Sequence, residues 1–180
     1  ISSSKAIGNM ETVKKRISFS LLVSILIGMP CMIAMIIFAK PILELLFPNA
    51  TSGAFIYQIS CLSIRFIVIE QIISGALHGL GKVLAPAMAL SIGVVIKFIL
   101  NLYLIPIDTK DFFLGGTAGA AISTVICHMI AVIIELKILN KNIDLKLDKK
   151  KFVFKPMLAS IIMSVFAYTF YLVMITRIND

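Results

Sequence analysis

Long runs of residues without a charged side chain constrain this sequence more than any other feature. Residues 17–39, 112–134 and 156–176 are predominantly apolar and contain no Asp, Glu, Lys or Arg. A helix that crosses a membrane needs about 20 such residues, because the hydrocarbon layer is about 30 Å thick and each helical residue rises about 1.5 Å. These three runs therefore predict membrane-spanning helices.

Two further apolar runs are interrupted by charge, one by Arg65 and Glu70 and the other by Lys97. In the first, the apolar residues only about balance the insertion cost of the two charged ones, so we expect this helix inside a bundle and not facing lipid. The sequence predicts an all-α, polytopic transmembrane bundle of five spanning helices. The predicted helices are residues 17–46, 54–78, 84–105, 113–137 and 156–176.

Composition supports a membrane protein and argues against other classes. Hydrophobic residues make up 59% of the 180 residues and charged residues only 14%, whereas soluble domains are about 25% charged. This excludes an ordinary cytosolic enzyme, a disordered tail and a nucleic-acid-binding module, despite the net charge of +8. Cys31, Cys61 and Cys127 lie in separate apolar runs and form no disulfide framework or metal set.

Lysine and arginine residues fall unequally on the two sides of the predicted bundle. One side receives Lys5, Lys14, Lys15, Arg16, Lys82, Lys137, Lys141, Lys146, Lys149, Lys150, Lys151 and Lys155, and the other receives Lys40, Lys110 and Arg177. The positive-inside rule places the first side in the cytoplasm. We therefore expect residues 1–16 to form a cytoplasmic loop, residues 138–155 a Lys-rich cytoplasmic linker and residues 177–180 an outer tail. Because the chain starts at Ile1, we also expect it to be part of a longer protein.

Small residues and one proline suggest how the helices pack. The 113–137 helix carries Gly115, Gly119 and Ser123 at four-residue spacing, a pattern that lets helices approach closely in lipid. Gly75 and Gly79 form a shorter stripe of the same kind. Pro30 lies in the middle of the first helix and predicts a kink there, because proline removes a backbone hydrogen bond.

The 54–78 helix has a polar side. Six residues fall within an arc of about 100°: Ser60, Ser63, Glu70, Gln71, Ser74 and His78. Arg65 points well away from that arc. Such a helix needs protein or water on both sides. The side chains of the polar arc either form hydrogen bonds within the bundle or line an aqueous cavity.

On the next helix Gly93, Lys97 and Asn101 share one face. Glu70 can neutralise only one of the two bases Arg65 and Lys97, so the embedded residues hold one positive charge in excess. This predicts that an anionic group is accommodated nearby. The alternative is that Lys97 reaches the membrane edge and backbone carbonyls cap Arg65.

The remaining polar positions give no catalytic signal. His128 is either a hydrogen-bonded packing residue or part of a proton relay. No His, Cys and carboxylate cluster has metal-ligand spacing, and neither a phosphate-binding loop nor a nucleophile elbow is present. We expect no cofactor, no metal and no enzyme activity, and we expect residues 79–82 to close a tight helical hairpin.

Several short motifs, in order, resemble one known family. They are GN at 8–9, IGMP at 27–30, LLFP at 45–48, EQIISGALHGLGK at 70–82, Pro86, Asn101 and GAA at 119–121. Together they resemble the polysaccharide-exporter branch of the multidrug/oligosaccharidyl-lipid/polysaccharide flippase superfamily. Within it they are most similar to the stage V sporulation protein B group, which is related to the lipid II flippase.

The resemblance implies a MATE-like fold of about fourteen helices in two inverted lobes, of which this chain would form the ninth to the thirteenth. It implies a multi-pass protein of the bacterial plasma membrane that moves lipid-linked oligosaccharide or peptidoglycan precursors by alternating access. The expected partners are the lipid-linked substrate, membrane lipids and the missing N-terminal lobe, and no nucleic acid. The alternatives are a cation-coupled multidrug exporter that uses Glu70, a non-transporting membrane scaffold and a membrane-bound transferase.

Overall fold

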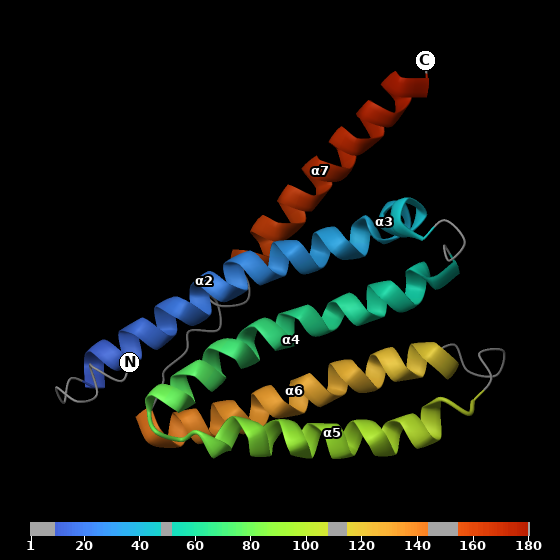
Figure 1. Ribbon diagram of the computed structural model, residues 1–180. Helices are drawn as coiled ribbons and strands as arrows, with labels where there is room; N and C mark the ends of the chain where they lie inside the picture. The colour runs from blue at the N-terminus through green and yellow to red at the C-terminus, as the bar shows by residue number, and fades with distance from the viewer. Residues whose placement is uncertain (1–9, 48–51, 108–114, 144–154, 180) are drawn as a thin grey trace.

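The computed structural model describes residues 10–47, 52–107, 115–143 and 155–179, and these residues fold into helices without a strand (Figure 1). The helices are α2 (Met10–Ile37), α3 (Ala39–Leu46), α4 (Ala54–Gly79), α5 (Leu84–Leu104), α6 (Gly116–Ile143) and α7 (Lys155–Asn179). Four of them, α2, α4, α5 and α6, are long and apolar enough to cross a membrane. In α7 the apolar stretch is the shorter segment Ser160–Tyr171. The fold is thus the predicted all-α transmembrane bundle.

The first helix begins earlier than predicted. Residues 10–16 were expected in a loop, but α2 starts at Met10. Val13 and Ile17 are fully buried and pack in one cluster with Ile73 and Leu77 of α4. This apolar contact extends the helix beyond the charge-free run. Residues 1–9 lie outside the described part of the chain.

The predicted 17–46 helix is two helices, joined by a bend at Phe38. The cause is Pro41, which has no N–H to offer the carbonyl of Ile37 and whose ring crowds that carbonyl. Flanking hydrogen bonds survive, from the Phe38 N–H to the Ala34 carbonyl and from the Ile42 N–H to the Phe38 carbonyl, both 2.9 Å. By contrast α2 continues as a helix through Pro30. The bend at Phe38 was not predicted, and the kink at Pro30 stays a prediction, because a continuous helix can still bend at a proline.

α6 is longer than predicted at its C-terminal end. It runs to Ile143, so residues 138–143, which were assigned to the linker, are helical. Leu139 and Ile143 are buried in the same cluster as the start of α2, which explains the extra turns. The rest of the expected linker lies outside the described residues until α7 begins at Lys155.

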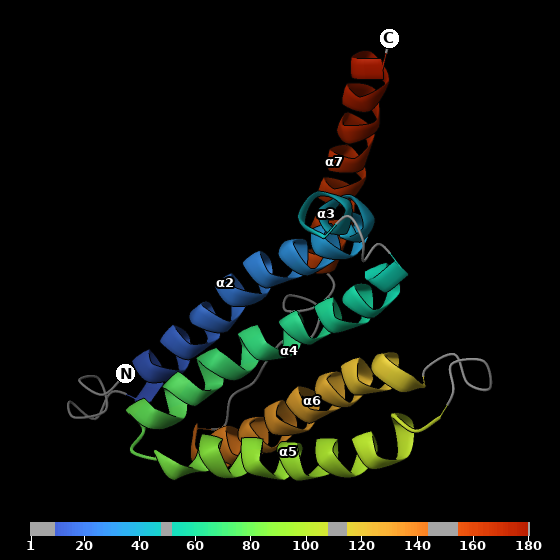
Figure 2. The ribbon, with the colours of Figure 1, turned by 45° about the vertical axis from the view of Figure 1, so that its right-hand side comes forward.

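The helices lie side by side in the order α7, α2, α4, α6, α5 (Figures 1 and 2). The turn between α4 and α5 is tight, as predicted. Gly81 has φ of 80°, and the N–H groups of Gly81 and Lys82 bond the His78 and Leu77 carbonyls. Yet α4 and α5, the two helices that the turn joins, do not pack along each other. α5 packs along α6, while α4 packs between α2 and α6.

Gly28 and Gly93 are places where two helices approach closely. A Cβ added at Gly93 would lie 2.7 Å from the Cys127 carbonyl oxygen, and one at Gly28 would lie 3.2 Å from Val68. Gly115, which directly precedes α6, is buried, and so are Gly119 and Ser123 of α6. Gly75, in contrast, is exposed, and a Cβ there would meet nothing within 4 Å. The predicted close packing therefore does not hold at Gly75, because no described helix covers that side of α4. Gly79 is half-buried at the last turn of α4.

Candidate functional site

Two polar contacts join α4 to α6 in the middle of the bundle. The first links the Oε2 atom of Glu70 on α4 to the Nδ1 atom of His128 on α6, at 2.7 Å. Both side chains are largely covered, with 12% of Glu70 and 22% of His128 exposed. Placing these two titratable side chains in hydrogen-bond contact inside an apolar bundle satisfies both of them locally.

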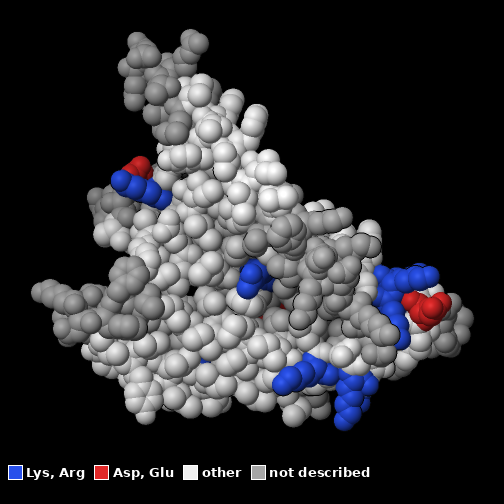
Figure 3. All heavy atoms as spheres, turned by 180° about the vertical axis from the view of Figure 1, so that it is seen from behind, with Lys and Arg blue, Asp and Glu red and all other residues white. Residues whose placement is uncertain are grey.

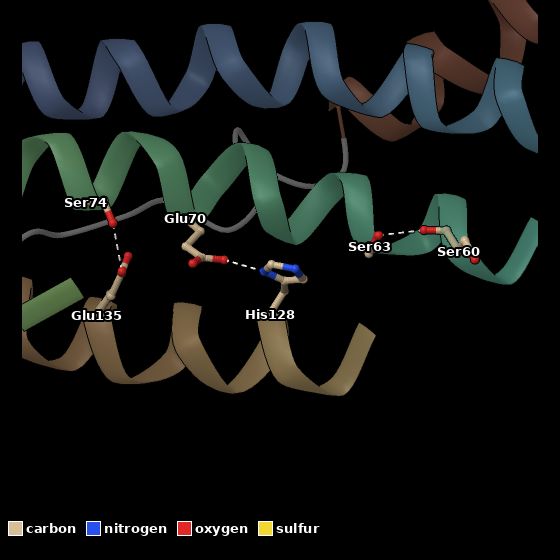
Figure 4. Close-up of polar contacts among 6 residues, drawn as sticks. All are labelled: Ser60, Ser63, Glu70, Ser74, His128 and Glu135. Carbon is tan, nitrogen blue, oxygen red and sulfur yellow. Dashed lines mark hydrogen bonds and ion pairs between the residues drawn. The ribbon is translucent and has the colours of Figure 1, made fainter. Parts of the chain in front are cut away.

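The second contact lies four residues further along α4. The Ser74 hydroxyl donates to the Oε1 atom of Glu135 on α6, at 2.9 Å (Figure 4). Glu135 is completely buried, and its Oε2 atom has no hydrogen-bond partner in the described part of the chain. We call Glu70, Ser74, His128 and Glu135 the α4–α6 seam. It is a row of polar contacts between two membrane-spanning helices.

The rest of the polar arc on α4 does not join the seam. Gln71 and His78 are exposed at its border, and so is Ser60. The Ser63 hydroxyl donates to the Ser60 carbonyl of its own helix at 2.6 Å (Figure 4). The arc is therefore divided. Glu70 and Ser74 are satisfied within the bundle, as one of the two alternatives proposed, while Gln71 and His78 remain open to the surroundings.

On α5, the face that carries Gly93, Lys97 and Asn101 is turned toward α6. Gly93 packs against Cys127, and the Oδ1 atom of Asn101 accepts a hydrogen bond from the buried Ser123 hydroxyl. Lys97 lies between these two positions, one helical turn from each, and is half-buried. The structure thus brings the three residues to the α5–α6 interface, separate from the α4–α6 seam.

Arg65 lies on the opposite side of α4 from the seam. It shares its helix side with Gln58, whose side-chain amide donates to the Ile36 carbonyl of α2 at 3.0 Å. Its guanidinium carbon lies 4.7 Å from the centre of the Phe66 ring, a cation–π contact, and the residue is half-buried. Arg65 therefore belongs to the α2 side of α4, as its separation from the polar arc predicts.

The embedded ionisable groups differ from those predicted. Glu135 was not among the predicted embedded ionisable groups, and with Glu70 it makes the number of embedded carboxyl groups equal to that of the bases Arg65 and Lys97. Within the described residues, however, neither acid neutralises a base. Glu70 contacts His128, Glu135 contacts Ser74, and no salt bridge forms at Arg65 or Lys97. Equal numbers of carboxyl groups and bases therefore do not neutralise either cation, and the expected excess of one positive charge stays a prediction.

Glu135 could have been found from the sequence. It follows directly after the charge-free run 112–134 and still lies inside the predicted 113–137 helix. The stripe of small residues on α6 continues beyond Ser123 in four-residue steps, through Cys127 and Ala131, and reaches Glu135. All of these positions are buried. An unbroken buried stripe that ends on a carboxyl group is a usable signal.

No metal or redox chemistry is indicated by the side chains that come together. The described residues contain no group of three His, Cys, Asp or Glu side chains that could hold a metal ion. The three cysteines are free. The embedded ionisable groups are the hydrogen-bonded carboxyl groups of Glu70 and Glu135, the His128 imidazole, and the separate cations Arg65 and Lys97.

Comparison with known proteins gives the family. The model of the MatE family matches residues 1–103, which is more than half of the chain. The chain belongs to the MatE family. Within the superfamily predicted from the motifs, this membership supports a membrane bundle but does not separate the polysaccharide-exporter branch from the others.

Two relatives are membrane proteins. "Uncharacterized membrane protein YabM" of Bacillus subtilis (strain 168) is 29% identical over 159 residues, which cover 87% of this chain and 28% of the relative. "Uncharacterized membrane protein MJ1068" of Methanocaldococcus jannaschii is 32% identical over 145 residues, which cover 78% of this chain and 27% of the relative. The chain thus spans little more than a quarter of the length of these relatives. No solved structure matches it.

Proposed function

We propose that this MatE-family chain is part of an exporter that moves lipid-linked oligosaccharide or peptidoglycan precursors across a bacterial plasma membrane. Transport would proceed by alternating access between two lobes, without covalent chemistry, because a change of affinity between two states is enough to move a substrate. The N-terminal lobe of the same protein would complete the transport path. The end of the bundle rich in lysine would face the cytoplasm.

One observation carries the proposal. Arg65 and Lys97 are cations on helices that span the membrane, and among the described residues no carboxylate forms a salt bridge with either. A cation within hydrocarbon is expensive unless a partner compensates it, so such residues commonly mark the path of a substrate or ion. A pyrophosphate that links a sugar to a lipid is an anion that these two side chains can compensate as it passes.

Translocation in vesicles tests the proposal. The full-length protein is reconstituted into liposomes with a fluorescent lipid-pyrophosphate sugar, and the exposed fraction is followed with an impermeant quencher. We expect Arg65→Gln and Lys97→Gln each to slow translocation about ten-fold, which corresponds to about 1.4 kcal/mol. Lys40→Gln is the matched control, because Lys40 is 72% exposed and lies outside the spans. Unchanged translocation rates in both variants would contradict the proposal. Export of cationic dyes without movement of the lipid would also contradict it and would favour a multidrug exporter.

A cation-coupled multidrug exporter is the second candidate function, and the α4–α6 seam favours it. Glu70, His128 and Glu135 are titratable groups held between two spanning helices, a place where proton-carrying residues of transporters are found. In this candidate Glu70→Gln abolishes the dependence of export on a proton or sodium gradient. Export with unchanged ion dependence in that variant would reject this candidate.

A further inference from the structure

A groove lies between α5 and α6 at the end of the bundle where the α4–α5 turn is found. Its volume is about 490 Å³, within the range of small-molecule sites. One wall is the first turns of α5, including Leu84, Met88 and Ile92, and the other is Ile134 and Ile138 of α6. Among the described residues that line it, Lys82 is the one with a charged side chain. It is separate from the α4–α6 seam and from Arg65.

The depth of the groove fits one leaflet of a bilayer. From Lys82 in the turn to Ile92 the helix rises about 15 Å, which is half of a hydrocarbon layer about 30 Å thick. An acyl chain of a membrane lipid needs an apolar wall along one leaflet only. The groove therefore has the length and the apolar lining that suit a lipid tail.

The charge at the open end of the groove suits an anionic head group. Lys82 lies in the turn at the membrane edge, and Lys141 follows Ile138 by one turn on nearly the same side of α6. Both lysines are exposed. Figure 3 shows Lys and Arg side chains gathered at this end of the molecule. Basic pockets between spanning helices are places where anionic head groups bind, and each basic residue adds to the attraction.

We propose that the α5–α6 groove binds an anionic membrane phospholipid, with one acyl chain along Met88 and Ile92 and the phosphate at Lys82. The lipid belongs to the leaflet at the lysine-rich end of the bundle. It fills the space between the first turns of α5 and Ile134 and Ile138 of α6.

Native mass spectrometry of the full-length protein tests the site. The protein is titrated with phosphatidylglycerol and, separately, with phosphatidylcholine of the same chains. We expect preferential retention of phosphatidylglycerol, reduced about five-fold in Lys82→Glu. Lys15→Glu is the matched control, because Lys15 is an exposed lysine at the same end of the bundle, on α2. Equal retention of the two lipids by the wild-type protein, or equal losses in the two variants, would overturn the proposal.

A second measurement identifies the occupant even if Lys82→Glu fails to fold. A photo-crosslinking amino acid is placed at Met88, which is 63% exposed and lines the groove. We expect crosslinks to phospholipid. Crosslinks to another segment of the same protein would show that the protein itself covers the groove, and would overturn the lipid site. Neither measurement involves translocation, so its outcome is independent of the proposed transport function.

Discussion

At the scale of single residues, Glu135 is the least expected feature of the molecule. Its carboxyl group is completely buried and shares one hydrogen bond with Ser74. An ionised carboxylate in such a place would be costly, whereas an amide of the same shape still offers an acceptor to the Ser74 hydroxyl. Glu135 therefore serves in the α4–α6 seam as the hydrogen-bond acceptor of Ser74, a role that does not require a negative charge.

Substitution of Glu135 separates shape from charge. We predict that Glu135→Gln changes the free energy of unfolding by no more than about 1 kcal/mol. Glu135→Ala should destabilise the protein by about 2–5 kcal/mol, because it leaves a cavity and removes the partner of Ser74. Equilibrium unfolding of the full-length protein in mixed micelles measures both. Equal damage from the two variants would mean that the negative charge itself is required.

The contact between Glu70 and His128 can be measured by a double-mutant cycle. We predict a coupling free energy of about 0.6–1.7 kcal/mol between Glu70→Gln and His128→Ala, as found for hydrogen bonds between spanning helices. The control cycle uses position 71 in place of position 70, because Gln71 is the next residue along α4 and is exposed. Coupling between Gln71→Ala and His128→Ala should be close to zero. A zero value for both cycles would show that Glu70 and His128 do not interact.

At the scale of helices, the pairing of α5 with α6 depends on the lack of a side chain at Gly93. A Cβ there would collide with the Cys127 carbonyl, which belongs to the backbone and cannot turn aside. We predict that Gly93→Ala destabilises the protein by about 1–3 kcal/mol. Gly75→Ala is the matched control. A Cβ has open space there and alanine favours a helix, so it should be neutral or stabilise by about 0.5–1 kcal/mol. Equal effects at both glycines would contradict the packing of α5 on α6.

The length and period of the apolar runs were enough to predict the spanning helices and the shared face of Gly93, Lys97 and Asn101. The helix ends could not be predicted in the same way. Val13, Leu139 and Ile143 extend α2 and α6 because they meet a buried cluster assembled from helices far apart in the sequence. The bend at Phe38 could have been predicted from Pro41, which lies inside the predicted 17–46 helix.

The sequence predicted which residues of α4 and α5 belong to the candidate site, but not which residues of α6 they contact. Helical periodicity places Glu70 on the polar side of α4, yet it does not say which neighbour that side meets. Only the order of the helices in space, with α6 between α4 and α5, brings Glu70 to His128 and Ser74 to Glu135. The expectation that Glu70 would balance an embedded base failed for this reason.

At the scale of the whole molecule, the described helices form a layer with α7 at its edge. α7 packs on α2 with Ser160 buried, and its Tyr168 and Tyr171 rings contact the Phe38 ring at the bend that follows α2. Much of its remaining described surface is apolar and exposed, as are many positions on α5. Such surface is stable in lipid or against further helices of the same protein, and unfavourable in water.

Sidedness is the most direct test of the claim that this chain is embedded in a membrane. In a cysteine-free background of the full-length protein, single cysteines replace Lys15 at the start of α2 or Lys40 in α3, positions separated by about 33 Å of α2. We predict that an impermeant maleimide labels Lys40→Cys in intact cells and labels Lys15→Cys only after the membrane is opened. Equal labelling of both in intact cells, or recovery of folded protein from the soluble fraction without detergent, would contradict the claim.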